Sequence, residues 1–361
     1  MWLATGVLAQ GEPEDIDVPE NRAWLDMVDV SRVPDLPIRP VGSGVCENAT
    51  CDGDENKDDR CFESCGNNPT PEDVFGCPRD HTWALTFDDG PSNYTEHLLD
   101  ILDEHKIKAT FCVMGAHVEK YPEVVKRAYE AGHQIASHTY SHPHLMSLTN
   151  EQIIYEVKAT EEAIKNAIGI KPRYIRPPFG EADDRVKGLL KAMGYKVLLW
   201  NVDPTDYDVY MMADHSMRIQ SAFKNASSGI DTGLNLHEDP GFISLQHDLY
   251  KESIAQVPHI IKYLSKHGFK FSTAAECIDD HEPHDLLEEA VVAQNIQPAN
   301  TSMAVMSSAS ETSQPSHSST PQVKDAASRN HHVSSAATVN SIKLPVSLAA
   351  VALAGVTALF T

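Results

Sequence analysis

Seven short apolar runs, each with the length of a β-strand, alternate with longer amphipathic stretches between about residues 80 and 275. The runs lie at residues 83–87, 109–114, 133–137, 173–176, 196–200, 242–246 and 269–272. Regular alternation of short strands with helices predicts parallel βαβ units. We therefore expect an α/β fold, built as either a barrel or a doubly wound sheet.

Helix boundary signals support this alternation. Pro122 can begin a helix that ends at Gly132. Thr149 and Gln152 have the spacing of a capping box, and Gly169 can close the helix that this box begins.

Polar residues follow the predicted strands at the point where each strand ends. They are Asp88 and Asp89 after the first strand, His138 after the third, Arg176 at the end of the fourth, Asp203 after the fifth and His247 after the sixth. Barrels place their chemistry at the carboxyl ends of parallel strands. The sequence therefore predicts that these side chains share one site.

The adjacent acids and two histidines spaced four apart predict a metal centre. One carboxylate with His138 and His142 is a donor set that Zn²⁺ accepts with a position left open for water. The second carboxylate is then free to act as a base, which indicates a hydrolase. An Asp-Asp-Gly-Pro turn would explain Gly90 and Pro91, but it would not require both acids. His144 fits the ligand spacing less well and is expected at the rim.

Composition restricts the partners and the compartment. A formal net charge of -23 argues against nucleic acid and anionic membrane surfaces, because phosphate binding needs Lys and Arg clusters. Seven cysteines indicate an oxidising compartment. Cys112 lies in an apolar run and is expected to be a buried free thiol. A zinc finger before the domain is the alternative for the first cysteines, although that stretch contains no histidine. Glycosylation sequons begin at Asn48, Asn93, Asn225 and Asn300.

The two ends of the chain carry targeting patterns. Residues 344–360 are apolar and are followed only by Thr361, while small residues including Ser334 lie upstream of a polar spacer. This arrangement predicts a GPI-attachment signal with Ser334 as the attachment site; a tail-anchored helix is the alternative. Residues 1–9 are apolar but short, as in a remnant of a signal peptide. We expect a secreted protein, anchored by a lipid at the outer face of the plasma membrane and in the cell wall.

The shifts in composition divide the chain into five parts. They are a signal-peptide remnant at 1–9, a disordered, acidic, Cys-containing extension at 10–76, a catalytic domain at 77–280, a Ser/Thr-rich disordered stalk at 281–340 and the GPI-signal tail at 341–361.

Five motifs in order carry a family resemblance. They are Thr-Phe-Asp-Asp-Gly-Pro at 86–91, His-Thr-Tyr-Ser-His at 138–142, Arg-Pro-Pro-Phe-Gly at 176–180, Asp-Pro-Thr-Asp-Tyr at 203–207 and Leu-Gln-His at 245–247. With these motifs, residues 77–277 resemble the NodB-homology polysaccharide deacetylases of carbohydrate esterase family 4. The layout of the whole chain is similar to that of fungal GPI-anchored chitin deacetylases. The resemblance implies a distorted (β/α) barrel of about seven parallel strands.

The resemblance also implies the metal ligands and the base. Asp89, His138 and His142 would bind a divalent metal, Zn²⁺ with Co²⁺ as the alternative, and Asp88 would be the general base that activates metal-bound water. Arg176 would pair with Asp88 and orient it.

His247 would be the general acid that protonates the leaving amine. An acid of the fourth motif would hydrogen-bond to His247 and raise its pKa; Asp203 is the first choice and Asp206 the second.

The remaining implied roles concern substrate binding and disulfides. The backbone N–H of Phe179, where many relatives carry Tyr, would stabilise the oxyanion. Trp200 and Leu245 would enclose the acetyl methyl group or belong to the core, and Tyr207 would stack on a sugar ring. Cys77 and Cys277 would form a disulfide. Two more bridges, of open connectivity, would join Cys46, Cys51, Cys61 and Cys65.

The expected reaction is hydrolysis of the amide C–N bond of N-acetylglucosamine residues in chitin or chito-oligosaccharides, giving chitosan and acetate during cell-wall remodelling. Deacetylation of peptidoglycan or xylan is the nearest alternative, because those enzymes share the site. A cell-wall polysaccharide-binding protein without turnover is a third hypothesis, because a fold alone does not prove activity. We expect a monomer.

Overall fold

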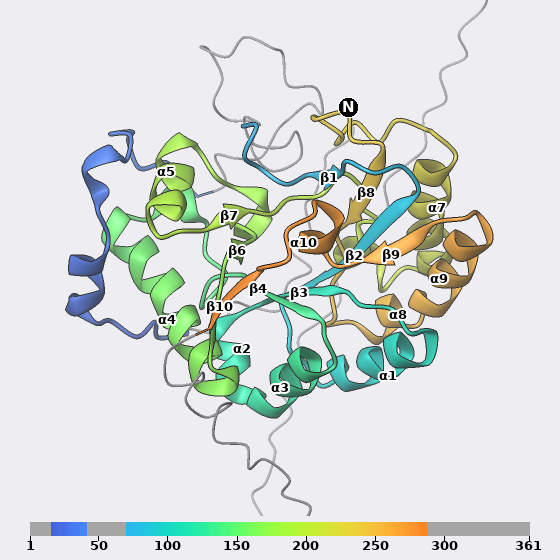
Figure 1. The fold of residues 1–361 in the computed structure, drawn as a ribbon, viewed down its shortest axis with the longest axis horizontal. Helices are drawn as coiled ribbons and strands as arrows, with labels where there is room; N and C mark the ends of the chain where they lie inside the picture. The colour runs from blue at the N-terminus through green and yellow to red at the C-terminus, as the bar shows by residue number, and fades with distance from the viewer. Residues whose placement is uncertain (1–15, 42–69, 287–361) are drawn as a thin grey trace, which may run out of the picture. The chain divides into compact units, whose positions relative to one another are not determined.

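The computed structural model describes residues 16–41 and 70–286, which form an α/β fold with helices around a central curled sheet (Figure 1). The sheet has the order β1-β8-β2-β3-β4-β6-β7, and β9 also pairs with β2. The strands are β1 (Gly76–Cys77), β2 (Thr82–Asp88), β3 (Thr110–Val113), β4 (Gln134–Ser137), β6 (Tyr174–Ile175), β7 (Lys196–Val197), β8 (Gly241–Ser244) and β9 (Lys270–Ser272).

Seven of these strands run parallel, and each overlaps one of the seven predicted runs. Parallel bridges of Val74 with Leu198 and of Val202 with Ser244 join the two edges. The expected distorted barrel is thereby confirmed. The antiparallel strand β1 was not predicted, and neither was a separate two-stranded sheet of β5 (Ile170–Pro172) and β10 (His284–Leu286).

Helices connect successive strands and cover the sheet (Figure 1). The α-helices are α1 (Thr95–His105), α2 (Gly115–Lys120), α3 (Pro122–Glu130), α4 (Asn150–Ile168), α5 (Asp184–Ala192), α6 (Asp206–Val209), α7 (His215–Ser227), α8 (Lys251–Ile254), α9 (Val257–Lys266) and α10 (Ala274–Cys277). The short 3₁₀ helices are η1 (Arg22–Met27), η2 (Val30–Arg32), η3 (Leu145–Ser147) and η4 (Pro178–Gly180). In the described parts of the chain, no helix combines the length and the apolarity that crossing a bilayer requires.

The predicted helix boundaries are confirmed. Helix α3 begins at Pro122, and α4 begins with a complete capping box in which Thr149 and Gln152 exchange hydrogen bonds. Gly169 ends α4 with a φ of 72°, a left-handed conformation that costs glycine little.

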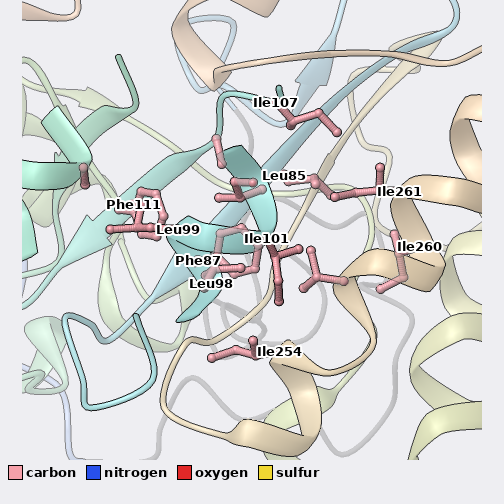
Figure 2. Packing of buried hydrophobic residues seen from close by; sticks show 14 of the residues in the cluster. Leu85, Phe87, Leu98, Leu99, Ile101, Ile107, Phe111, Ile254, Ile260 and Ile261 are labelled. Carbon is pink, nitrogen blue, oxygen red and sulfur yellow. The ribbon is translucent and has the colours of Figure 1, made fainter. Parts of the chain in front are cut away.

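The two faces of β2 show why the site lies inside the barrel. Leu85 and Phe87 point outward and pack against Leu98 and Leu99 of α1, as Figure 2 shows. The alternate residues point inward because side chains alternate along a strand. The inward set ends at Asp88, so the strand delivers this carboxylate to the barrel interior.

The inner core contains the predicted disulfide and the predicted buried free thiol. Cys77 and Cys277 form a disulfide across a sequence separation of 200 residues. Cys112 is buried and free, as expected, and burial raises the pKa of its thiol.

Residues 16–41 pack against the domain, which the sequence analysis did not predict. Trp24, Leu25 and Val28 join the apolar cluster formed by α4 and α5. Arg39 forms an ion pair with Asp183 at 3.4 Å.

We predict that His133 destabilises the protein in acid. Its Nδ1 accepts a hydrogen bond from the Ala109 N–H at 3.1 Å, and burial lowers its pKa to about 4. In the unfolded chain His133 binds a proton at a higher pH, near 6.5. The stability that the neutral, buried imidazole contributes is therefore fully present above pH 6.5 and is lost as the pH falls toward 4. The free energy of unfolding should fall by about 3 kcal/mol across this window through this group.

Urea denaturation of the protein and of His133→Gln between pH 7 and pH 4 measures this contribution. The variant should lose less stability over the window, because glutamine does not titrate. Parallel pH profiles for the two proteins would contradict the prediction.

Candidate active site

The two adjacent acids lie at a sharp bend at the end of β2. Asp88 is the last residue of the strand, and Asp89 has a φ of 71°. Asp tolerates this left-handed conformation better than most residues do. The bend places both carboxylates at the carboxyl end of the barrel, where both are almost fully buried.

Asp89, His138 and His142 come together as a group that can hold a metal ion. Asp89 Oδ1 lies 3.2 Å from His138 Nε2 and 3.4 Å from His142 Nε2. One ligand atom from each residue lies within 4.8 Å of the others. Asp89 Oδ1 is buried without a hydrogen-bond partner, an arrangement that a divalent cation would satisfy. The residues therefore fit the implied metal.

The surroundings prepare both imidazoles for this role. His138 Nδ1 donates to the Arg176 carbonyl oxygen at 2.7 Å, which leaves the Nε2 lone pair facing Asp89. Burial lowers the pKa of His142 to about 4, which keeps this imidazole neutral as metal binding requires. Burial alone would raise the pKa of Asp89, but His142, His138 and His247 together lower it well below its ordinary value.

Arg176 pairs with Asp88, as predicted. Its Nη1 donates to Asp88 Oδ1 at 2.6 Å and to the Thr86 hydroxyl at 2.7 Å. The guanidinium also donates to the carbonyl oxygens of Leu198 and Leu199. Because Arg176 is fully buried and its donors are fixed on several sides, it leaves Asp88 little freedom to rotate.

Asp206, and not Asp203, is the hydrogen-bond partner of His247. His247 Nδ1 donates to Asp206 Oδ1 at 2.7 Å, and the His247 backbone N–H donates to Oδ2 at 2.9 Å. The Ser253 hydroxyl also donates to Asp206. The first choice, Asp203, is therefore wrong for this contact: its carboxylate instead accepts from the Thr205 N–H at 2.6 Å and from the Tyr207 hydroxyl at 3.3 Å.

The pair changes the protonation of His247. Burial would lower the pKa of His247, but Asp206 outweighs burial and raises it to about 10. His247 is therefore a proton donor at neutral pH. Its Nε2 lies 4.0 Å from Asp89 Oδ2, on the side of the cavity that faces the metal ligands.

A cavity of about 340 Å³ opens above these groups. It is lined by Asp88, His138, His142, Pro177, Phe179, Trp200, Asp203, Thr205, Tyr207, Leu234, Leu245 and His247. The four predicted substrate-binding residues, Phe179, Trp200, Tyr207 and Leu245, are all among them. Leu234 was missed; it belongs to the loop between α7 and β8, where Thr232 donates a hydrogen bond to the Asn201 carbonyl oxygen.

Comparison with known proteins places the chain in a family. Residues 75–198 match the family model described as polysaccharide deacetylase. The chain is 33% identical over 202 residues to the peptidoglycan-N-acetylglucosamine deacetylase of Bacillus cereus, across 55% of this chain and 70% of that protein. The chain belongs to the polysaccharide deacetylase family.

This chain is also similar to fungal members of the family. Chitin deacetylase 1 of Cryptococcus neoformans is 32% identical over 283 residues, which cover 73% of this chain and 57% of the relative. The structure of the chitin deacetylase from Colletotrichum lindemuthianum superposes with a TM-score of 0.55 at 30% identity, across 60% of this chain and 96% of that chain. The chain matches 57% and 50% of the first two curated relatives, and so spans about half of their length.

Phe179 contacts the imidazoles of His142 and His144. Its ring packs edge-on against His142, with centroids 4.6 Å apart, and stacks on His144 at 4.1 Å. His144 also pairs with Glu181 at 3.0 Å and lies outside the metal group, as expected for a rim residue. The Phe179 backbone has a φ of 59°, a strained conformation for a bulky residue.

The remaining predicted sites lie on the surface or outside the described residues. Asn93 and Asn225 are exposed, so their glycosylation stays a prediction. The other predicted positions fall outside residues 16–41 and 70–286, and they are Asn48, Asn300, Cys46, Cys51, Cys61, Cys65 and Ser334.

We predict that Asp206→Asn lowers the pKa of His247 by several units, because the charge that opposes burial is removed. The matched variant Asp203→Asn, three residues away, should leave the pKa of His247 elevated. Titration of the imidazole by NMR in the metal-free protein measures both. An equal fall in the two variants would show that Asp206 is not the dominant partner.

Proposed function

We propose that this chain is a metal-dependent deacetylase that hydrolyses N-acetyl groups of N-acetylglucosamine residues in chitin, giving chitosan and acetate. The observation that carries this proposal is the grouping of Asp89, His138 and His142 between two buried pairs, Asp88 with Arg176 and His247 with Asp206. A base and an acid on either side of a metal site are what amide hydrolysis requires.

A divalent ion bound to the triad would polarise the substrate carbonyl and lower the pKa of water, and zinc is the first choice with cobalt as the alternative. Asp88 accepts the proton of the attacking water, since Arg176 holds its carboxylate toward the cavity. The Phe179 N–H donates to the oxyanion. His247 then donates its Nε2 proton to the departing amine, which leaves acetate and a free glucosamine unit.

The cavity lining supports an acetyl group as the part of the substrate that enters. Trp200, Leu234 and Leu245 offer apolar contacts for a methyl group. Tyr207 lies against His247, with ring centroids 5.2 Å apart, and can contact the sugar that carries the scissile amide.

Two observations favour chitin as the polymer. Several of the relatives are named chitin deacetylases of fungi. The acidic chain is suited to a neutral polymer whose product is cationic. Peptidoglycan is the second candidate, because the Bacillus cereus relative is named for it.

We also propose the location and the assembly. The sequons, the cysteines and the apolar run at 344–360 support a secreted, monomeric enzyme held at the outer face of the plasma membrane by a GPI lipid. The parts of the predicted extension and stalk at 42–69 and 287–340 would then flank the catalytic domain.

The test is acetate release from chito-oligosaccharides and from peptidoglycan fragments, with products identified by mass spectrometry. Zinc-loaded protein should release acetate from chito-oligosaccharides at the higher kcat/KM. A higher kcat/KM on peptidoglycan would reassign the polymer, and no release from either would overturn the proposed function.

A further inference from the structure

The two histidine ligands lie on a loop whose backbone is strained. Residues 138–142 follow β4 and precede η3, so no helix or strand holds them. Thr139 has a φ of 66° and His142 a φ of 60°. A β-branched residue such as Thr139 is rarely found in this region, so its conformation is strained. Something outside the loop must therefore stabilise this conformation.

Several groups outside the loop do so. The Gly115 and Ala116 N–H groups of α2 donate to the Thr139 and Tyr140 carbonyl oxygens, and one buried carboxylate accepts three further hydrogen bonds from the loop. Glu156 Oε2 accepts hydrogen bonds from the backbone N–H groups of Tyr140, at 2.8 Å, and Ser141, at 2.9 Å. Glu156 Oε1 accepts from the Ser141 hydroxyl at 2.5 Å. Two successive N–H groups that converge on one anion form a nest, and the left-handed Thr139 just before them creates that geometry.

Glu156 lies on the buried side of helix α4. Glu156 is only 3% exposed, and the Thr160 hydroxyl donates to the Glu156 carbonyl oxygen at 2.8 Å. Gly115 at the start of α2 lies so close to Tyr140 and Thr160 that any side chain there would collide with them. The loop, α2 and α4 are therefore closely packed at this point.

Glu156 does not belong to the metal-binding group of the described residues, which is Asp89, His138 and His142. Its three hydrogen bonds end at the residues between the two histidines. Within the loop, the His142 N–H donates to the Thr139 hydroxyl at 3.2 Å and completes the turn.

We propose that Glu156 is a positioning residue for the metal centre: its carboxylate holds the 138–142 loop in the conformation that directs both imidazoles toward Asp89. The inference deepens the proposed function and rests on it for the role of the metal. Partners of metal ligands typically change metal affinity by about 10- to 100-fold when they are replaced.

The test compares variants of the full chain by metal titration. Glu156→Leu keeps the approximate volume but removes every acceptor, so the Kd for Co²⁺ should rise by about 10- to 100-fold. Glu156→Asp keeps the charge but shortens the reach, and it should raise the Kd by about tenfold. Glu156→Gln can still accept from both N–H groups, so its Kd should stay within about fivefold of the parent value.

Glu161→Leu is the matched control. Glu161 lies on the same helix and bonds to Lys158 and Tyr195, away from the loop. It should leave the Kd and the visible absorption spectrum of bound Co²⁺ unchanged. That spectrum reports the arrangement of ligands and should change in Glu156→Leu and Glu156→Asp, which a general loss of stability would not produce.

An unchanged Kd and spectrum in Glu156→Asp would overturn the inference even if Glu156→Leu failed to fold. A loss in Glu156→Gln as large as in Glu156→Leu would overturn the hydrogen-bond account. These readouts need no substrate, so a protein that binds Co²⁺ through the triad but releases no acetate would disprove the proposed function and still allow the test of Glu156.

Discussion

Replacing Asp88 by asparagine should lower kcat/KM for acetate release by about three orders of magnitude. An amide cannot take the proton of the attacking water, and general-base catalysis contributes about 10²- to 10⁴-fold. Asparagine has nearly the same shape and can still accept a hydrogen bond from Arg176, so the cavity should keep its form.

Metal titration separates this effect from loss of the metal. Asp88 lies outside the Asp89 group, so the Kd for Zn²⁺ should change by only a few-fold. Asp100→Asn is a suitable control, because Asp100 is an exposed acid on α1 that pairs with Arg127. Full activity in Asp88→Asn would show that another group accepts the proton, and the mechanism proposed for this site would be wrong.

Removing the metal should lower acetate release at least as much as the Asp88→Asn substitution does. Dialysis against a chelator should reduce acetate release by about 10³-fold or more, because Lewis-acid stabilisation is worth several kcal/mol and each 1.36 kcal/mol is a factor of ten. Added Zn²⁺ should restore the activity. In His142→Ala the same concentration of Zn²⁺ should fail to restore it, because one of the three ligands is gone.

His144→Ala provides the matched comparison for metal binding. His144 is two residues from His142 but pairs with Glu181. Its loss should therefore leave the Kd for Zn²⁺ within a few-fold of the parent value, whereas His142→Ala should raise that Kd greatly. Equal losses in the two variants would mean that His144 and not His142 completes the site. Activity that survives exhaustive chelation would exclude a metal-dependent reaction.

The grouping of Asp89, His138 and His142, which could hold a metal ion, was predictable because the spacing of these residues in the sequence carries the information. Asp88, Asp89, His138 and His142 occur in two motifs that follow strands, and parallel strands bring their carboxyl ends together. The seven parallel strands were predictable for a related reason, since strands buried on both faces leave continuous apolar runs.

The partner of His247 could not be read in the same way. Asp203 and Asp206 lie three residues apart in one motif, and either acid suits the chemistry. The choice depends on where α6 begins and on Ser253, which follows His247 by six residues and donates to Asp206. Such tertiary contacts have no local signal.

Leu234 and Glu156 were missed for different reasons. Leu234 lies in a loop without periodicity, where an apolar residue indicates nothing specific. Glu156 lies in a helix between buried Tyr155 and Val157, and an acid at the buried side of a helix was a signal that could have been noticed. The packing of Trp24 against the domain was not predicted, because the residue lies in an acidic stretch whose overall composition indicated an extension.

The disulfide between Cys77 and Cys277 has a further consequence for resistance to proteolysis. Every residue of the proposed machinery, from Asp88 to His247, lies within the covalent ring that this bond closes. A single cut in a surface loop inside the ring would leave both fragments tethered, so the halves of the barrel could reassociate without diffusing apart. Cuts before Cys77 or after Cys277 would leave the ring intact, and the flanking segments could be trimmed without dividing the machinery.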